Sequence, residues 1–151
     1  MNGYKRILVP TDGSKLSLKA AKEATALAKD LKAAITAVYV MPPWIPPMMI
    51  DGTGLPAEAF DERAFIKATE ATARTALEKV QATAKAAKVA CDTIAVRENQ
   101  PWQGIVKTAK SKKCDLIVMA SHGRTGVAAV VLGSETRKVL AHASKPVLVC
   151  H

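Results

Sequence analysis

The sequence predicts a single α/β domain in which helices cover both faces of an open parallel sheet. Short apolar runs of strand length alternate with longer segments whose apolar residues recur at helical spacing. Several of the short runs are apolar at successive positions, which is typical of strands covered on both faces. A length of 151 residues suffices for one hydrophobic core, so we expect one domain over residues 1–151.

Five runs predict strands and four intervening segments predict helices. The strands are expected at residues 6–10, 34–40, 93–96, 115–119 and 146–150, and the helices at about 14–31, 56–88, 102–112 and 134–143. Alanine dominates the apolar stripes of the first two helices, which lets them lie close to the sheet. Regular alternation of strand and helix makes consecutive strands parallel, with the helices as crossovers.

The net charge of +9 raises the question of a nucleic-acid partner, since 22 Lys and Arg outnumber 13 Asp and Glu. Most lysines recur at helical spacing opposite the alanine-rich faces, as on solvated helix surfaces. Aromatic residues make up only 4% of the chain, so a stacking platform for bases is not expected. This pattern disfavours nucleic acid and predicts a diffuse preference for anionic partners.

The cysteines and the apolar runs indicate where the protein resides. Cys91, Cys114 and Cys150 are far apart and lack the spacing of a zinc site, which fits a reducing compartment. The first apolar run is too short for a signal peptide, and none is long enough to cross a bilayer. We therefore expect a cytoplasmic protein without a membrane span and without a metal held by the chain itself.

A proline-rich segment runs from Met41 to Pro56, directly after the second predicted strand. Its five prolines exclude regular ladder and helix hydrogen bonding. The simpler interpretation is an ordered connector packed on the body of the domain. The alternatives are a lid over a ligand or a polyproline surface for a partner protein.

Polar residues follow the first strand, in Pro10-Thr11-Asp12-Gly13-Ser14. Asp12 or Ser14 can cap the helix that starts here, because short side-chain oxygens accept its free N–H groups. Alternatively, the Asp12 carboxylate can accept hydrogen bonds from sugar hydroxyls or a base amine.

A glycine-containing turn follows the fourth strand, and a second glycine precedes the last helix. Gly123 lets the backbone approach an anion, and the N–H groups from Gly133 and Ser134 onward form an anion site together with the helix dipole. Arg124 would add a full positive charge. The plainer alternative is a turn and an N-cap serine. Sequence fingerprints of P-loop ATPases, dinucleotide enzymes and serine hydrolases are absent, and nothing supports a catalytic triad built on His122.

Four stretches together resemble the universal stress protein family over nearly the whole chain. They are KRILVPTDGS, DLIVMASHGRTG, a Gly-Ser pair separated from Gly123 by nine residues, and the closing KPVLVC. The resemblance implies a Rossmann-like sheet of order 3-2-1-4-5 and a homodimer. The dimer contact would run from Pro146 to Cys150, and we expect the apolar stretch from Val127 to Leu132 to contribute.

The ATP-binding branch of that family has the motif G-x-x-G, nine residues, then G-[ST]. Gly123 matches the second glycine and Gly133-Ser134 the end of the motif, while Ala120 stands where the first glycine is expected. A methyl group there does harm only if the position needs positive φ or close contact with the ligand. The nucleotide-binding residues implied by the resemblance and the turn are Pro10, Thr11, Asp12, Val40, Met119, Ala120, His122, Gly123, Arg124, Gly133, Ser134, Glu135 and Thr136.

The resemblance thus implies an ATP-binding regulator of a stress response, with Mg²⁺ bridging the phosphates. A positioned general base is not evident, so hydrolysis or autophosphorylation would be slow. One alternative is a dimeric interaction module that binds no nucleotide, which Ala120 favours. Another is a binder of cyclic AMP or AMP, because the adenosine half of the motif matches better than the triphosphate half.

Overall fold

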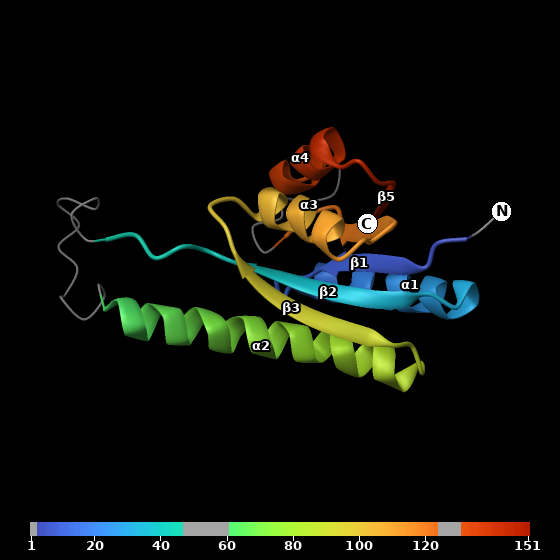
Figure 1. The fold of residues 1–151 in the computed structure, drawn as a ribbon, viewed down its shortest axis with the longest axis horizontal. Helices are drawn as coiled ribbons and strands as arrows, with labels where there is room; N and C mark the ends of the chain where they lie inside the picture. The colour runs from blue at the N-terminus through green and yellow to red at the C-terminus, as the bar shows by residue number, and fades with distance from the viewer. Residues whose placement is uncertain (1–2, 47–60, 124–130) are drawn as a thin grey trace.

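The computed structural model describes residues 3–46, 61–123 and 131–151. Five parallel strands form one sheet in the order β3-β2-β1-β4-β5. The strands are β1 (Arg6–Pro10), β2 (Ala34–Met41), β3 (Cys91–Arg97), β4 (Leu116–Ala120) and β5 (Val147–Cys150). The helices are α1 (Lys15–Leu31), α2 (Glu62–Ala86), α3 (Pro101–Ser111) and α4 (Ser134–His142). The chain builds the sheet outward from β1 to β3 and then returns to add β4 and β5 on the other side (Figure 1).

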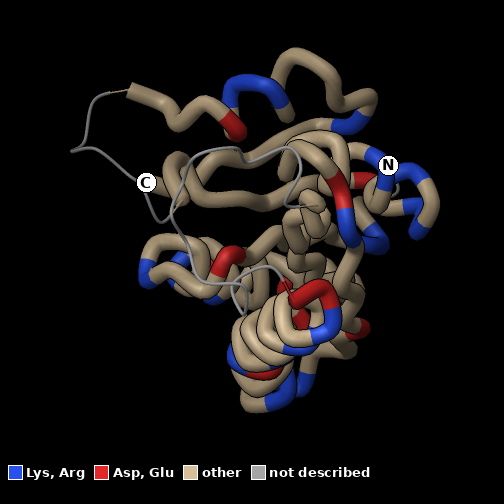
Figure 2. The backbone as a smooth tube through the Cα atoms, turned by 90° about the vertical axis from the view of Figure 1, so that its left-hand side faces the viewer, with Lys and Arg blue, Asp and Glu red and all other residues tan. Residues whose placement is uncertain are grey.

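The helices are divided between the two faces of the sheet. Helices α1 and α2 pack together on one face, whereas α3 and α4 pack on the other. In Figure 1, α3 and α4 lie above the sheet and α2 lies below it. Figure 2 shows the molecule turned so that α2 is seen end-on beneath the sheet. The predicted fold class and strand order are therefore confirmed.

Burial on both faces explains why the strands are apolar at successive positions. In β1, Ile7 and Val9 belong to the core beneath α1 and α2, and Leu8 belongs to the core beneath α3 and α4. All three side chains are fully buried. On α1, Ala24 and Ala28 face the first of these cores, and their small side chains bring the helix close to the strands.

The observed elements differ from the predicted ones mainly at the sheet edge and at the ends of helices. Strand β3 runs over Cys91–Arg97 and is longer than the predicted 93–96, because as an edge strand it carries exposed residues such as Asp92. Strand β4 ends at Ala120, one residue later than predicted. Helix α2 begins at Glu62, where Asp61 accepts hydrogen bonds from the backbone N–H groups of Arg63 and Ala64.

The first part of the proline-rich segment is tied to the end of β3. The Arg97 guanidinium donates to the Pro42 carbonyl at 2.6 Å and to the Thr69 hydroxyl at 3.1 Å. One side chain thus joins β3, the exit from β2 and helix α2. Residues 47–56 of the predicted segment lie outside the described residues, so the connector and lid interpretations stay predictions. Among the described residues, no helix combines the length and the apolar character needed to cross a bilayer.

Candidate functional site

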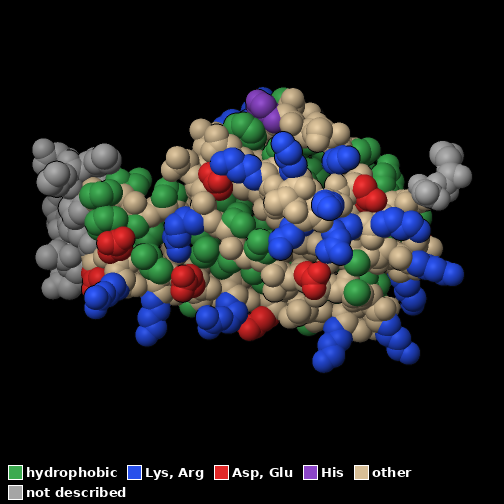
Figure 3. Space-filling model, in the orientation of Figure 1, with side chains coloured by type: hydrophobic (Ala, Val, Ile, Leu, Met, Phe, Trp, Pro, Cys, Tyr) green, Lys and Arg blue, Asp and Glu red, His purple; other side chains and the backbone are tan. Residues whose placement is uncertain are grey.

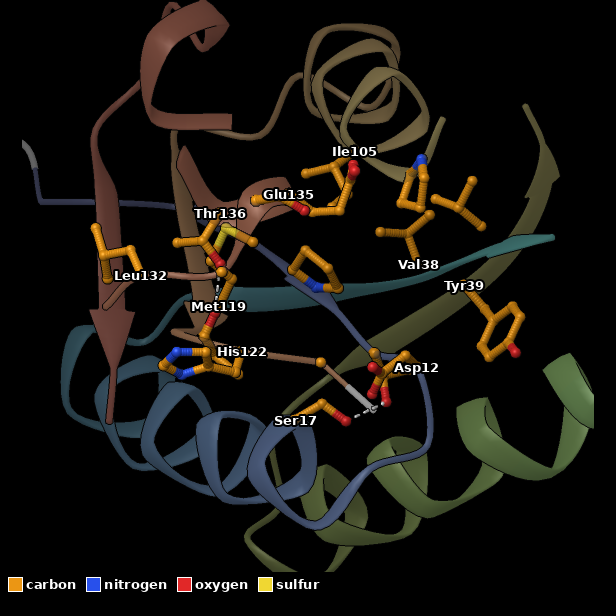
Figure 4. A pocket seen from close by; sticks show the side chains of 18 of the residues that line it. Asp12, Ser17, Val38, Tyr39, Ile105, Met119, His122, Leu132, Glu135 and Thr136 are labelled. Atoms are coloured by element: carbon orange, nitrogen blue, oxygen red, sulfur yellow. Dashed lines mark hydrogen bonds between the residues drawn. The ribbon is translucent and has the colours of Figure 1, made fainter. Parts of the chain in front are cut away.

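A cavity of about 610 Å³ opens at the carboxyl ends of the strands. Residues from β1, β2 and β4, and from the first turns of α3 and α4, line it (Figure 4). The edge between β1 and β4 is where the strand order reverses, and this is the place where open parallel sheets bind ligands. Its volume lies within the range of small-molecule sites.

The cavity brings together every predicted site residue that the structure describes. They are Pro10, Thr11, Asp12, Val40, Met119, Ala120, His122, Gly123, Gly133, Ser134, Glu135 and Thr136. Arg124 lies outside the described residues. The same holds for residues 127–130 of the apolar stretch, whereas Val131 and Leu132 line the cavity.

Five further lining residues were not predicted from the sequence: Ser17, Val38, Tyr39, Pro101 and Ile105. Val38 and Tyr39 precede the predicted Val40 on β2. A prediction that included the last three residues of the predicted strand would have found them. Pro101 and Ile105 come from α3, one helical turn apart. Nothing local in the sequence shows that α3 lies over this edge of the sheet.

The turn after β1 is built by its own short polar side chains. Ser14 caps α1 by accepting the Ser17 N–H at 3.1 Å. Asp12 accepts the Ser14 N–H at 2.9 Å, and Gly13 has a φ of 82°, a conformation that glycine adopts without strain. Of the two predicted cap residues, Ser14 is therefore the N-cap, and Asp12 shapes the turn that presents its carboxylate to the cavity.

Gly123 lies against that carboxylate. A Cβ atom added to Gly123 would come within 2.6 Å of Asp12 Oδ2. The glycine therefore allows the turn after β4 to close onto the turn after β1. Residues of both turns line the same cavity.

Gly133 allows an equally close approach at the start of α4. Its N–H donates to the Ser121 carbonyl at 2.8 Å, and an added Cβ atom would lie 3.0 Å from that same oxygen and 3.4 Å from His122 Cα. The neighbouring atoms are backbone, which cannot turn aside as a flexible side chain can. A side chain at Gly133 would therefore push α4 away from the end of β4.

The first turn of α4 presents N–H groups to the cavity. Gly133 is the N-cap residue and supplies no side-chain cap. The Thr136 hydroxyl donates to the carbonyls of Ala120 and Ser121 at 3.0 and 3.1 Å, which fixes the start of the helix over the end of β4. A helix start without a side-chain cap attracts anions through its N–H groups and its dipole.

Ala120 takes an ordinary strand conformation. It is the last residue of β4, pairs with Cys150 on β5 and has no positive φ. The next N–H, that of Ser121, donates to the Cys150 carbonyl at 2.8 Å. The condition under which a methyl group would strain the backbone at this position is therefore not met.

Glu135 connects the two helices above the sheet. Its Oε2 accepts the Trp102 N–H at 2.8 Å, and its Oε1 lies 3.6 Å from Lys138 Nζ. The N-cap residue of α3, Gln100, makes no side-chain cap of its own. Glu135 therefore caps α3 from the first turn of α4 while its carboxylate lines the cavity.

His122 and Ser121 form a polar pair beside the glycine turn. The Ser121 hydroxyl lies 2.9 Å from His122 Nδ1 and is buried. Figure 4 shows the imidazole on the same side of the cavity as Met119 and Leu132. Within the described residues, no group of three or more His, Cys, Asp or Glu side chains is arranged to hold a metal ion.

Comparison with known proteins agrees with this architecture. Residues 3–151 match the universal stress protein family. A universal stress protein of Methanocaldococcus jannaschii is 40% identical over 148 residues, which are 98% of this chain and 82% of that protein. One from Thermus aquaticus is 33% identical, with 97% of this chain and 98% of the other covered.

Solved structures show the same fold. Universal stress protein UspA from Lactobacillus plantarum superposes with a TM-score of 0.78 at 29% identity, covering 98% of each chain. A universal stress protein solved in complex with cAMP superposes with a TM-score of 0.71 at 26% identity, covering 98% of this chain and 97% of that one. The match of sequence and fold extends over essentially the entire chain, and the protein belongs to the universal stress protein family.

Proposed function

We propose that this protein binds an adenine nucleotide, ATP in the first instance, and acts as a nucleotide-responsive regulator in a stress response. The observation that supports the proposal best is the composition of the cavity at the carboxyl edge. Apolar side chains line one part of it, and the start of α4, with no side-chain cap, lines another. A family member at 26% identity was solved with the adenine nucleotide cAMP.

The adenosine would lie against the apolar part of the cavity. Val40 from β2 and Ile105 from α3 supply apolar contact for the base. Asp12 is placed beside Gly123 at the lip of the same cavity, where its carboxylate can accept a hydrogen bond from a ribose hydroxyl.

The phosphates would lie at the start of α4. Backbone N–H groups from Gly133 onward and the adjoining glycine turn at Gly123 suit phosphate oxygens. Mg²⁺ commonly keeps several waters and is held through nucleotide phosphates with one or two carboxylates. Asp12 and Glu135 are the carboxylates that line the cavity, so the ion would arrive with the nucleotide, bridging its phosphates.

Regulation fits the residues of the site better than fast catalysis does. Asp12 accepts a backbone N–H in the β1 turn, and Glu135 caps α3. Both carboxylates therefore serve in building the cavity. Slow hydrolysis or autophosphorylation would follow from holding the triphosphate in place.

Cyclic AMP or AMP is the second candidate ligand. The cAMP complex of the relative favours it, and so does Ala120, whose methyl group occupies the expected position of the first glycine of the triphosphate motif. A dimeric interaction module without nucleotide is the third candidate. The three candidate functions predict different ligands, so one series of nucleotide titrations can distinguish them.

Isothermal calorimetry with ATP, ADP, AMP and cAMP, with and without Mg²⁺, tests the proposal. We expect micromolar ATP binding that is lost in Gly133→Val, because the new side chain collides with the Ser121 carbonyl. Gly3→Val is the matched control, since a Cβ atom there meets only Leu31 at 3.7 Å. Absence of heat with every nucleotide would overturn the proposal, and preference for cAMP would favour the second candidate.

We also propose a homodimer through β5. As the outer strand beside β4, it has a second edge that the sheet does not pair, and Leu148 on it is 46% exposed. Val131, at 66% exposure, offers a further apolar contact. The molecular mass in solution of Leu148→Glu, compared with the unaltered protein, tests this proposal: an unchanged dimer would remove β5 from the contact.

A further inference from the structure

The amino edge of the sheet, opposite the cavity, carries a row of lysines. One lysine precedes each strand, and the spatial order of the row follows that of the sheet. From β3 to β5 the row consists of Lys88, Lys32, Lys5, Lys113 and Lys145, all of them exposed. Neighbouring strands lie about 4.8 Å apart, so the row spans roughly 20 Å.

Three of these lysines occupy backbone conformations that favour glycine. Lys32, Lys88 and Lys113 have φ values of 54°, 59° and 53°, and within the described residues they are the only non-glycine residues with positive φ. Each follows the C-terminus of a helix, where glycine or asparagine is the common choice. Lysine therefore stands at three turns where glycine would relieve backbone strain.

A helix C-terminus attracts a cation through its dipole, which would account for one lysine at each helix end. The amino edge carries more lysines than this effect requires. Four further exposed lysines lie in or just after the last turns of α1, α2 and α3: Lys29, Lys85, Lys110 and Lys112. In Figure 3, Lys and Arg side chains crowd the right-hand end of the molecule, where Figure 1 shows the strands beginning.

Of the described carboxylates at this edge, none is paired with a lysine side chain. Asp115 accepts the backbone N–H groups of Lys5 and Arg6, and Asp92 is 3.4 Å from the Arg6 guanidinium. Asp30 in the last turn of α1 is the third acid. Within the described part of the chain, none of the nine lysine ammonium groups makes an ion pair or a hydrogen bond.

We propose that the amino edge binds the phosphate backbone of single-stranded nucleic acid without regard to base sequence. A linear row of charges suits a linear polyanion. The phosphates of a stacked strand advance by about 3.4 Å per nucleotide along its axis, and a flexible single strand can adjust that advance to the row. The scarcity of aromatic residues argues against stacking of the bases on this protein, but it does not prevent contact with the phosphate backbone of a nucleic acid. Exposed apolar side chains that would enter a bilayer are scarce beside the row, where Tyr4 is 37% exposed.

The sequence disfavours nucleic acid because its lysines are expected to be spread over solvated helix faces. The fold shows a different distribution. In the folded protein, the ends of four helices and the starts of five strands converge, and nine lysines gather at one edge. Contact of the five row lysines with five phosphates predicts a slope of about −3.5 for log K against log salt concentration.

The triple substitution Lys32→Gly, Lys88→Gly and Lys113→Gly tests this proposal. Glycine relieves the left-handed backbone at each position, so the variant should melt at the same temperature as the unaltered protein or higher. We expect its affinity for a fluorescent single-stranded oligonucleotide of about 20 nucleotides, read by anisotropy at low salt, to fall roughly tenfold or more, and the salt slope to shrink to about −1.4.

Lys22→Gln, Lys67→Gln and Lys79→Gln together form the matched control, since they remove the same charge from exposed positions in the bodies of α1 and α2. Equal weakening in both triple variants would mean that only net charge matters and would overturn the proposal. Tighter binding of anionic phospholipid vesicles or inorganic polyphosphate than of the oligonucleotide would also overturn it. ATP calorimetry on the same variants should be unchanged, because the cavity lies at the opposite edge.

Discussion

The turns at the two edges of this sheet are built from different residues. At the carboxyl edge, Gly123 and Gly133 allow close approach of neighbouring turns, and Gly13 adopts a positive φ. At the amino edge, lysines occupy turns whose conformation glycine would adopt more easily. The carboxyl edge thus presents rigid backbone donors around a cavity, and the amino edge presents long mobile charges on an open surface.

The two proposed sites would therefore recognise their ligands in different ways. Fixed N–H groups at a helix start select an anion by its position, and their effect depends on close packing. Exposed ammonium groups respond to the summed charge of a partner and are screened by salt. Substitutions at the carboxyl edge should therefore change stability and ligand affinity together, whereas those at the amino edge should change affinity without a loss of stability.

The largest effect is expected from Gly104→Leu in α3. A Cβ atom at Gly104 would lie 2.6 Å from Val40 Cγ2, and 3.2 Å from Val96 Cγ2, so α3 must move off the sheet. We expect a loss of about 1–3 kcal/mol in the free energy of unfolding, and weaker nucleotide binding because Val40 and Ile105 both line the cavity. Denaturant unfolding and calorimetry, with Gly3→Leu as control, check this; loss of one property without the other would break the link between packing and affinity.

Thr136→Val should have the next largest effect. It keeps the shape of the side chain but removes the buried hydroxyl that donates to the carbonyls of Ala120 and Ser121. The unfolding free energy should fall by about 1–2 kcal/mol, and ATP binding should weaken because the start of α4 loses its anchor. Thr136→Ser retains the hydroxyl and should restore both; failure of that rescue would show that the methyl group is what matters.

A smaller effect is expected from Glu135→Ala. This change removes the acceptor for the Trp102 N–H and leaves α3 without the cap that α4 supplies. The expected loss is about 1 kcal/mol of unfolding free energy, whereas Glu135→Gln, which keeps an acceptor oxygen, should lose less. Equal losses in thermal or denaturant unfolding of the two variants would assign the effect to the carboxylate charge instead of the hydrogen bond.

The smallest expected effect concerns a thiol at the amino edge. Burial, and then the neighbouring Asp92 carboxylate, raises the pKa of Cys91 to about 11 from its ordinary value of 9.0. Between pH 9 and 11 the unfolded thiol loses its proton while the folded one keeps it, so stability falls as the pH rises through this window. Cys91→Ser should flatten that part of the stability curve, and parallel curves for the two proteins would contradict the role of this thiol.

The sequence predicts the fold well because each strand is marked by its own apolar run. Strand β1 was predicted at its observed bounds, since residues on both faces are buried. The edge strand β3 was predicted too short, because exposed residues such as Asp92 interrupt its apolar pattern. Local patterns are thus reliable for an element covered on both faces and incomplete for one with a face in solvent.

The candidate-site residues on strands and turns were predictable from the sequence, whereas those that reach the cavity through the packing of helices on the sheet were not. Asp12, Gly123 and Gly133 stand next to strand ends, so their convergence follows from a parallel sheet. Ile105 enters the cavity through the placement of α3, and the contact between Glu135 and Trp102 joins two helices whose packing no local pattern encodes. The left-handed lysines were not predictable either, because glycine is the expected residue at such turns.

The hydrogen bond from the Ser121 N–H to the Cys150 carbonyl joins the border of the cavity to the end of the outer strand. Ser121 begins the turn that borders the cavity, and Cys150 ends the outer strand of the sheet. If a ligand shifts that turn, this hydrogen bond offers a direct route for the shift to reach the end of β5. If β5 also joins two subunits, reciprocity requires that a nucleotide strengthen subunit association by the same factor by which association strengthens nucleotide binding.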